Sequence, residues 1–412
     1  MIEKIKSTVK SELFIGSLIL MILINIGNVI NYIFHFSMAR MLGPASYGIF
    51  AVLANLIYIF SVPTLSIQTL VSKHTTKYKV KKEYGRIKGV FNYLIKETLV
   101  ISLVIYVIFL IASIYLSKSL NISFYLLALT GVFLFIAFIS PIPIGILQGM
   151  KKFNTWGWNY VISCLSKLLI AIILVLIGFR VYGAILGFII GTVISFFLVF
   201  PFIKEILYSK EIKEKVHIFS RDNLPTVLAI LMIVLMYSVD VIFVKIFFDP
   251  ETAGKYAIVS LLGKIILFGT SAVGNAMFPI SSEKYESGGK SRGVIKKTYL
   301  AVGFMCICAL LIFGFFPELI IKILFGARYL GAANILIYVA TAFSVLSLLN
   351  IFILYKISIN KFRLVHSIIL ALLFILELLV MFYTNSSLEL FSISFMISTI
   401  IIFIASVILI RK

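Results

Sequence analysis

The sequence predicts an all-α polytopic membrane protein with about twelve transmembrane helices in two pseudo-symmetric six-helix lobes around a central cavity. Of its 412 residues, 61% are hydrophobic and 13% are charged, whereas soluble domains carry about 25% charged residues. The apolar residues form runs of the length that crosses a bilayer, about 20 residues. A short motif also returns at half the chain length, which indicates two related halves.

Twelve apolar runs are long enough to span a membrane. We expect these spans at residues 13–39, 46–71, 89–116, 123–148, 157–178, 182–203, 224–248, 254–280, 295–316, 331–355, 364–383 and 389–410. Pro63 lies inside the second run, and Pro141 and Pro143 lie inside the fourth. Because proline removes a backbone donor and clashes with the preceding turn, we expect these two spans to be kinked or broken.

The repeated motif joins one span to the next in each half. Its second copy follows the first by 206 residues, and four positions align without a gap: Pro44, Gly48, Phe50 and Ala51 with Pro250, Gly254, Tyr256 and Ala257. Six spans per half give both halves the same orientation in the membrane, which is a parallel repeat. We therefore expect an N-terminal lobe at 1–203, a cytoplasmic linker at 204–222 and a C-terminal lobe at 223–412.

Basic residues are divided unevenly between the two sides of this topology. The side that holds both termini carries 27 of the 37 Lys and Arg residues, and the opposite side carries 7. Positive residues concentrate in cytoplasmic loops, so we expect a multi-pass protein of the cell membrane with both termini in the cytoplasm. This topology accounts for most of the net charge of +21, and the charge therefore does not require a nucleic acid partner.

Polar side chains form a stripe on one face of the first span. Asn25, Asn28, Asn31, Tyr32 and His35 fall within about 120° of each other on a helix. Intramembrane amides either bond a neighbouring helix or line a hydrated cavity that binds substrate. We favour the cavity, because five polar groups exceed what one packing contact needs.

Four basic residues extend this candidate substrate site. Arg40 and Lys245 lie at the outer ends of spans one and seven, where they either face the substrate or extend to the membrane surface. Lys167 and Lys264 lie in the middle of their spans, and ionisable residues at that depth are functional candidates. The excess of cations predicts a positive potential suited to an anionic ligand.

Two acidic residues are candidates for ion coupling. Asp240 should lie at a similar depth to Lys264, because a short outer turn joins their spans, and a structural ion pair between them is the alternative interpretation. Glu377 has no partner that the sequence identifies, so we interpret it as a proton or cation site.

Enzyme motifs are absent from the sequence. There is no Walker A sequence, no metal-ligand spacing of His, Cys and carboxylates, and no loop large enough for an extramembrane catalytic domain. We therefore expect neither an enzyme nor a bound cofactor or metal. A polytopic glycosyltransferase or oligosaccharide polymerase would need catalytic residues on larger outer loops, and a structural scaffold would not need buried charges.

Two stretches resemble a known family. Residues 38–51 (MARMLGPASYGIFA) resemble the end of the first helix and the start of the second in the Wzx-like polysaccharide flippases, and residues 146–153 (ILQGMKKF) resemble their exit from the fourth helix. These flippases share the MATE/MOP superfamily with multidrug extruders and lipid II flippases. The lack of two extra spans argues against a lipid II flippase, and the dominance of intramembrane cations argues against a drug extruder.

This resemblance implies a flippase that moves a polyprenyl-diphosphate-linked oligosaccharide from the cytoplasmic to the outer leaflet by alternating access, for cell-surface polysaccharide synthesis. Its partners would be the lipid-linked oligosaccharide diphosphate and membrane lipids. The protein would be a monomer, and whether it associates with polysaccharide-assembly enzymes stays open. The four basic residues would hold the diphosphate, and the polar stripe would hold the sugars. Coupling to H⁺ or Na⁺ also stays open, and the alternative function is an H⁺- or Na⁺-coupled multidrug extruder of the same fold.

Overall fold

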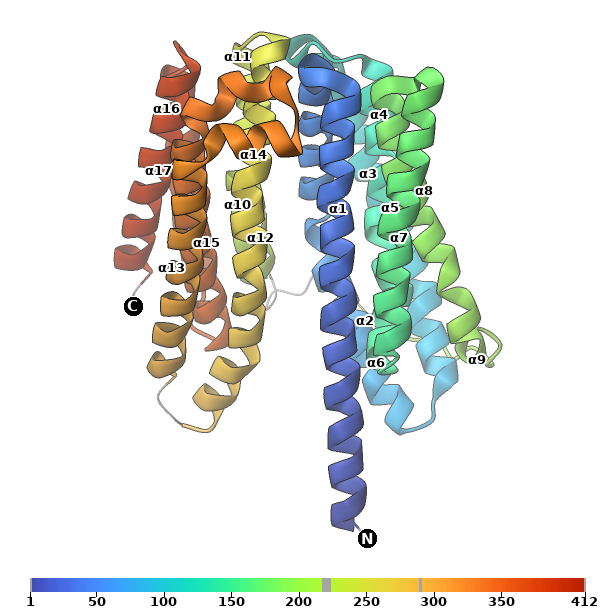
Figure 1. Cartoon of the computed structure of the whole chain (residues 1–412). Helices are drawn as coiled ribbons and strands as arrows, with labels where there is room; N and C mark the ends of the chain where they lie inside the picture. Colours follow the sequence, from blue (N-terminus) through green and yellow to red (C-terminus); the bar gives the residue numbers. More distant parts are fainter. Residues whose placement is uncertain (1, 217–223, 289–290, 411–412) are drawn as a thin grey trace. The chain divides into compact units, whose positions relative to one another are not determined.

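The structure of the chain is a computed structural model that describes residues 2–216, 224–288 and 291–410, with side chains from Gly16 onward except Ser17 (Figure 1). All regular elements in these ranges are helical. The part of the predicted linker after residue 216 lies outside the described residues. The chain divides into two compact units, Met1–Leu42 with Leu56–Ile218, and Gly43–Asn55 with Phe219–Lys412. The predicted lobe boundaries stay a prediction.

The first unit combines long helices, most of them apolar, with short helical segments. In chain order the elements are α1 (Ile2–Phe60, which continues through the first segment of the second unit), α2 (Val62–Val80), α3 (Tyr84–Leu120), α4 (Phe124–Gly131), α5 (Phe133–Ile139), α6 (Pro141–Gly149), α7 (Phe153–Leu174), η1 (Val175–Phe179), α8 (Arg180–Leu198), η2 (Phe200–Ile203) and α9 (Lys204–Leu207).

The second unit continues the same pattern of long apolar helices with short interruptions. Its remaining elements are α10 (Leu224–Met236), α11 (Val239–Phe247), α12 (Pro250–Glu286), α13 (Arg292–Phe315), α14 (Pro317–Leu324), η3 (Ala327–Ile335), α15 (Leu336–Ser358), α16 (Leu364–Tyr383) and α17 (Leu388–Leu409).

The chain crosses a membrane many times. Ten stretches of the described chain are long and apolar enough to span a bilayer, and two of them, Leu18–Val80 and Phe153–Leu207, have 63 and 55 residues. At about 1.5 Å per residue, such lengths far exceed a hydrocarbon core of about 30 Å. Each of the two contains a sharp backbone break, so dividing them there is consistent with the twelve expected spans. The prediction of an all-α, polytopic membrane protein is confirmed.

The first break reverses the direction of α1. Gly43 has φ +73° and ψ 171°, which a helix does not tolerate. In a straight helix, residues 23 positions apart would lie about 35 Å apart. Here the Tyr58 hydroxyl and His35 Nε2 are 3.3 Å apart, and both belong to the first unit. The chain therefore turns back at Gly43.

Prolines break the spans in which they were noticed. Pro63 lies at the start of α2, directly after the turn that ends α1 at Phe60. The fourth span is divided twice, before Pro141, which is the first residue of α6, and at Val132, where no proline predicted a break. The expected kinks are confirmed. The seventh span is also divided, between α10 and α11, and no proline predicted that break.

The two copies of the repeated motif meet inside the second unit. A Cβ atom added at Gly48 would lie 2.9 Å from the backbone nitrogen of Gly254, and one added at Gly254 would overlap the carbonyl oxygen of Pro44. Such overlap means that the two backbones touch directly, which only glycine permits. The residues that align in sequence therefore also pack against each other.

Candidate functional site

A partly buried hydrogen-bonded chain joins α1 to α7 in the first unit. We call it the amide–lysine cluster, and its members are Asn28, Asn31, Tyr160, Cys164 and Lys167. The Tyr160 hydroxyl donates to Asn28 Oδ1 at 2.9 Å, and Asn31 Nδ2 donates to Tyr160 Oη at 3.1 Å and to Cys164 Sγ at 3.3 Å. Lys167 Nζ donates to Asn31 Oδ1. Two amides of the predicted stripe thus bond a neighbouring helix.

Aromatic rings complete the surroundings of Lys167. Its ammonium nitrogen lies 4.6 Å from the ring centroid of Phe34 and 4.2 Å from that of Phe188. Both distances are within the range of cation–π attraction. The side chain is 8% exposed, and among the described residues no carboxylate forms an ion pair with it. The cluster therefore holds one buried positive charge without a paired anion.

Three glycines of α8 position Lys167. Gly183, Gly187 and Gly191 are spaced four residues apart and face α7, where added Cβ atoms would lie 2.8 Å from Leu174 Cβ, 2.6 Å from Ala171 Cβ and 2.7 Å from Lys167 Cβ. Small residues at this spacing let two membrane helices approach closely. The close approach of α7 and α8 (Figure 1) brings Phe188 over the lysine.

A second buried cluster lies in the second unit. We call it the carboxylate–lysine cluster: Asn55, Asp240, Tyr256, Ser260, Lys264 and Glu377. Lys264 Nζ donates to Asn55 Oδ1 at 2.6 Å. Asp240 Oδ2 accepts from the Ser260 hydroxyl at 2.6 Å and from the Tyr256 hydroxyl at 3.3 Å. Asp240 also interacts electrostatically with Lys264 and with Glu377, and the exposed fractions of these three side chains are 0%, 2% and 1%.

Several oxygen atoms of this cluster are buried without a partner. Both carboxyl oxygens of Glu377, Oδ1 of Asp240 and the hydroxyl of the adjacent Ser238 have no hydrogen bond within the described chain. A buried unsatisfied polar group costs about 1–3 kcal/mol, and more if it is charged. Four such oxygens in one region could together bind a proton or a small cation.

The break in the seventh span places Asp240 in this region. The chain turns at Tyr237 and Ser238, and α11 begins at Val239. Asp240 therefore lies in the first turn of a helix, where unpaired backbone N–H groups favour a negative side chain. Discontinuous membrane helices of this kind are typical of transporter binding sites.

The other predicted site residues lie outside these hydrogen-bonded clusters. Asn25 is exposed and donates to the carbonyl oxygen of Met21 in its own helix. His35 is buried and shares a hydrogen bond with Tyr58. Arg40 is exposed, three residues before Gly43, and Lys245 is buried in the last turn of α11. The roles of all ten predicted residues stay predictions.

The sequence did not reveal several members of the clusters. None of Tyr160, Asn55, Tyr256 and Ser260 was predicted to belong to a site, and Tyr256 was noted only as part of the repeated motif. Cys164 is buried, and no site role was expected for it. The available signal was the regular Gly183, Gly187 and Gly191 spacing, which marks α8 as a close-packing surface for the helix that carries Lys167.

Neither cluster has the composition of a metal centre. Among the described residues, no group of three or more His, Cys, Asp or Glu side chains is arranged to hold a metal ion. The first cluster offers a cation and amides, which suit an anionic or hydroxylated ligand. The second offers carboxylates and hydroxyls, which suit a proton or a monovalent cation.

Solved structures with the same fold are of proteins named as transporters or flippases. An inward-facing multidrug resistance MATE family transporter of the MOP superfamily matches with a TM-score of 0.71 at 13% identity, over 92% of this chain and 94% of that one. The lipid II flippase MurJ in an inward closed conformation matches with a TM-score of 0.69 at 13% identity, over 96% and 88%. At these identities the likeness establishes the fold. The matched proteins are transporters and a flippase, in keeping with an expected lack of enzymatic activity.

Sequence comparison identifies the family. No curated protein matches this chain in sequence. The model of the family described as "Polysaccharide biosynthesis protein" matches residues 13–285, about two thirds of the chain. The resemblance noticed in residues 38–51 and 146–153 lies within this range. The chain is therefore a member of the polysaccharide biosynthesis protein family and has the fold of the MATE/MOP transporters.

Proposed function

We propose that this protein is a flippase that moves a polyprenyl-diphosphate-linked oligosaccharide from the cytoplasmic to the outer leaflet of the cell membrane. The observation that carries the proposal is the Lys167 ammonium, buried among amides and aromatic rings without a paired carboxylate. A diphosphate supplies the missing negative charge, and charge-assisted hydrogen bonds are the strongest available at such a site. The amides and tyrosines beside it suit the hydroxyl groups of a sugar chain.

The proposed cycle is alternating access by two lobes, 1–203 and 223–412, with both termini in the cytoplasm. Lys167 and Lys264, with Arg40 and Lys245, would attract the diphosphate. Asn25, Asn28, Asn31 and His35 would hold the sugars. Asn28, Asn31 and Tyr160 already form hydrogen bonds with each other. When a sugar binds, its hydroxyl groups would replace these hydrogen bonds, at little net cost in free energy.

The carboxylate–lysine cluster would couple the cycle to H⁺ or Na⁺. The unsatisfied oxygens of Asp240 and Glu377 support this role, because a proton or cation bound there would remove the cost of their burial. The same oxygens favour a second candidate function, an H⁺- or Na⁺-coupled multidrug extruder. In that case the carboxylates would be needed for transport and Lys167 would not.

Ligand binding to purified protein tests the proposal. We expect a polyprenyl-diphosphate oligosaccharide to raise the thermal unfolding temperature of the wild type, and Lys167→Met to remove most of that shift. One charge-assisted hydrogen bond contributes about 1.5–3 kcal/mol, or about 10- to 150-fold in affinity. Lys118→Met, at an exposed lysine, is the matched control. A stabilisation that survives Lys167→Met removes this residue from the site, and a response to cationic drugs alone favours the extruder.

A further inference from the structure

The chain that follows α9 lies against the cytoplasmic end of α3. Residues 208–216, which we call the arm, form no helix, and all of them belong to the first unit. The backbone N–H of Ile212 donates to the carbonyl oxygen of Gly85 at 3.0 Å. Val216, at the end of the arm, is buried. The arm is therefore packed on the unit and not extended into solvent.

Two glycines of α3 make room for the arm. Gly85 and Gly89 are one helical turn apart, and added Cβ atoms would overlap the carbonyl oxygens of Lys210 and Ile212. At Gly89 the Glu214 backbone nitrogen is also 3.1 Å from the added atom. The helix thus presents a groove that fits a bare backbone and excludes any side chain.

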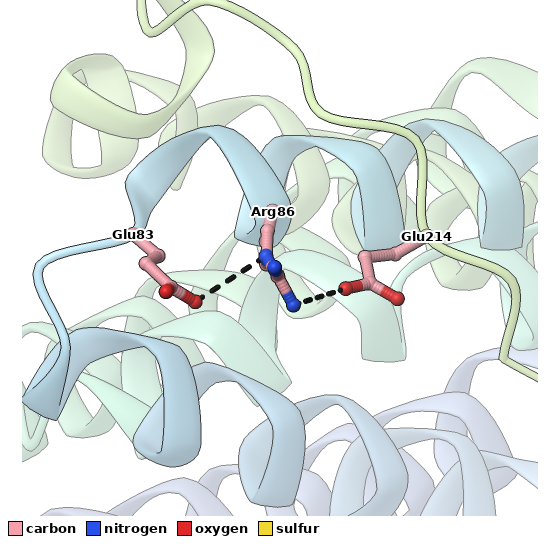
Figure 2. Close-up of polar contacts among 3 residues, drawn as sticks. All are labelled: Glu83, Arg86 and Glu214. Carbon is pink, nitrogen blue, oxygen red and sulfur yellow. Dashed lines mark hydrogen bonds and ion pairs between the residues drawn. The ribbon is translucent and has the colours of Figure 1, made fainter.

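Side chains hold the arm on both edges of this groove. Arg86 forms ion pairs with Glu214 at 3.0 Å and with Glu83 at 3.3 Å, so it joins the arm to the turn before α3 (Figure 2). Asn92 Nδ2 donates to Glu211 Oε2 at 2.8 Å, and Lys88 Nζ donates to the carbonyl oxygen of Ser209 at 3.0 Å. Contacts therefore follow the arm from its first residues to its last.

The chain passes between the two units at three places, and the last of them lies in the connection from α9 to α10. We propose that docking of the arm shortens this connection and so limits how far the two helix ends that it joins can separate. With the arm docked, the undocked part of the connection is at most the chain from Val216 to Leu224. With the arm released, it runs from Leu207 to Leu224. A fully extended chain spans about 3.5 Å per residue, so release raises the maximum reach from about 28 Å to about 60 Å. This limit applies whatever the protein transports.

The glycine groove contributes more to docking than the ion pairs. The Arg86 and Glu214 side chains are 41% and 22% exposed, and such surface pairs contribute little. A methyl group at Gly89 would instead displace the arm from the helix. Because alanine favours a helix over glycine, Gly89→Ala leaves α3 intact while it releases the arm.

Hydrogen exchange provides the first test. The Ile212 amide, bonded to Gly85, is expected to exchange at least tenfold more slowly than a free amide in the wild type, and to lose that protection in Gly89→Ala. Gly303→Ala is the matched control, because its added Cβ would meet nothing within 4 Å. An unprotected Ile212 amide in the wild type overturns the proposal.

Distances between spin labels at Lys204→Cys and Lys361→Cys provide the second test, with the three native cysteines replaced. In Gly89→Ala we expect the distance distribution to extend by up to about 30 Å, and in Gly303→Ala we expect no change. Arg86→Glu should produce a smaller extension that Glu214→Arg reverses. An unchanged distribution in a Gly89→Ala protein whose Ile212 amide has lost protection shows that the arm does not limit this connection.

Discussion

The two buried clusters use corresponding spans of the two halves and differ in charge. Lys167 lies in the fifth span and Glu377 in the eleventh, while Asn31 and Asp240 lie in the first and seventh. The first cluster places one cation among hydrogen-bonded amides, and the second contains two carboxylates, of which Asp240 interacts with the one cation. The fold therefore fixes where polar groups lie but not their sign.

The clusters also differ in how far their polar atoms are satisfied. Each amide of Asn28 and Asn31 has a partner on α7, whereas Glu377 has none on either oxygen within the described chain. A satisfied network is stable without a ligand, and an unsatisfied one is stabilised when something binds. Stability measurements can therefore separate the two clusters.

The largest expected effect is from Lys264→Met. The substitution removes the cation that interacts with Asp240 and leaves the Asn55 oxygen without its donor. Loss of one partner from a buried charged group costs about 3–5 kcal/mol, and we expect a loss of that size in chemical unfolding. Adding Asp240→Asn should recover part of it. If the double variant is no more stable than Lys264→Met alone, Asp240 and Lys264 are energetically independent.

A change of opposite sign is expected from Glu377→Leu. Leucine keeps much of the volume and removes two buried oxygens without partners, so the protein should gain about 1–3 kcal/mol in stability. The same substitution should abolish any dependence of unfolding on Na⁺ or on proton concentration that this cluster causes. A loss of stability would mean that the carboxyl group is satisfied in the folded protein.

The cap of α12, which carries Lys264, should contribute about 1 kcal/mol. Asp249 Oδ1 accepts from the backbone N–H groups of Glu251 and Thr252 at 3.0 and 3.1 Å, and the hydrogen bonds from Thr252 lower the pKa of Asp249 below 3.8. Its contribution is therefore complete above pH 3.8 and is lost as the pH falls through the lowered pKa. We expect Asp249→Ala to be less stable than wild type at pH 7, and the difference to shrink in acid. A constant difference would rule out the carboxylate as its source.

The smallest expected change in stability is from Lys167→Met. Removing a buried ammonium that has no paired carboxylate removes its desolvation cost, and this gain offsets the hydrogen bond to the Asn31 oxygen that is lost. We therefore expect a net shift below about 1 kcal/mol, even though the same variant should lose binding of the diphosphate lipid. Lys167→Arg is the informative companion, because it keeps the charge. A large destabilisation by Lys167→Met would make the lysine a structural element of the first unit.

The sequence predicted the helices better than it predicted which side chains contact each other between helices. Hydrophobic runs identified the spans, and Pro63 and Pro141 identified the breaks beside them. Both kinds of signal act within one helix. The short outer turn also predicted that Asp240 and Lys264 lie close together. The partners of Asn31 could not be predicted, because periodicity shows which face is polar but not which helix meets it. The break at Tyr237 and Ser238 carries no proline or glycine, so no local signal indicated it.

The contact between Gly48 and Gly254 has a consequence for the origin of the repeat. A half-length chain that paired with itself about a two-fold axis would place this glycine against its own copy in a self-complementary interface. Any substitution there would appear on both sides of the contact at once, and two added Cβ atoms would have to fit where the present backbones leave room for none. A homodimeric ancestor would therefore have had its smallest residue fixed at this position before the two halves became one chain.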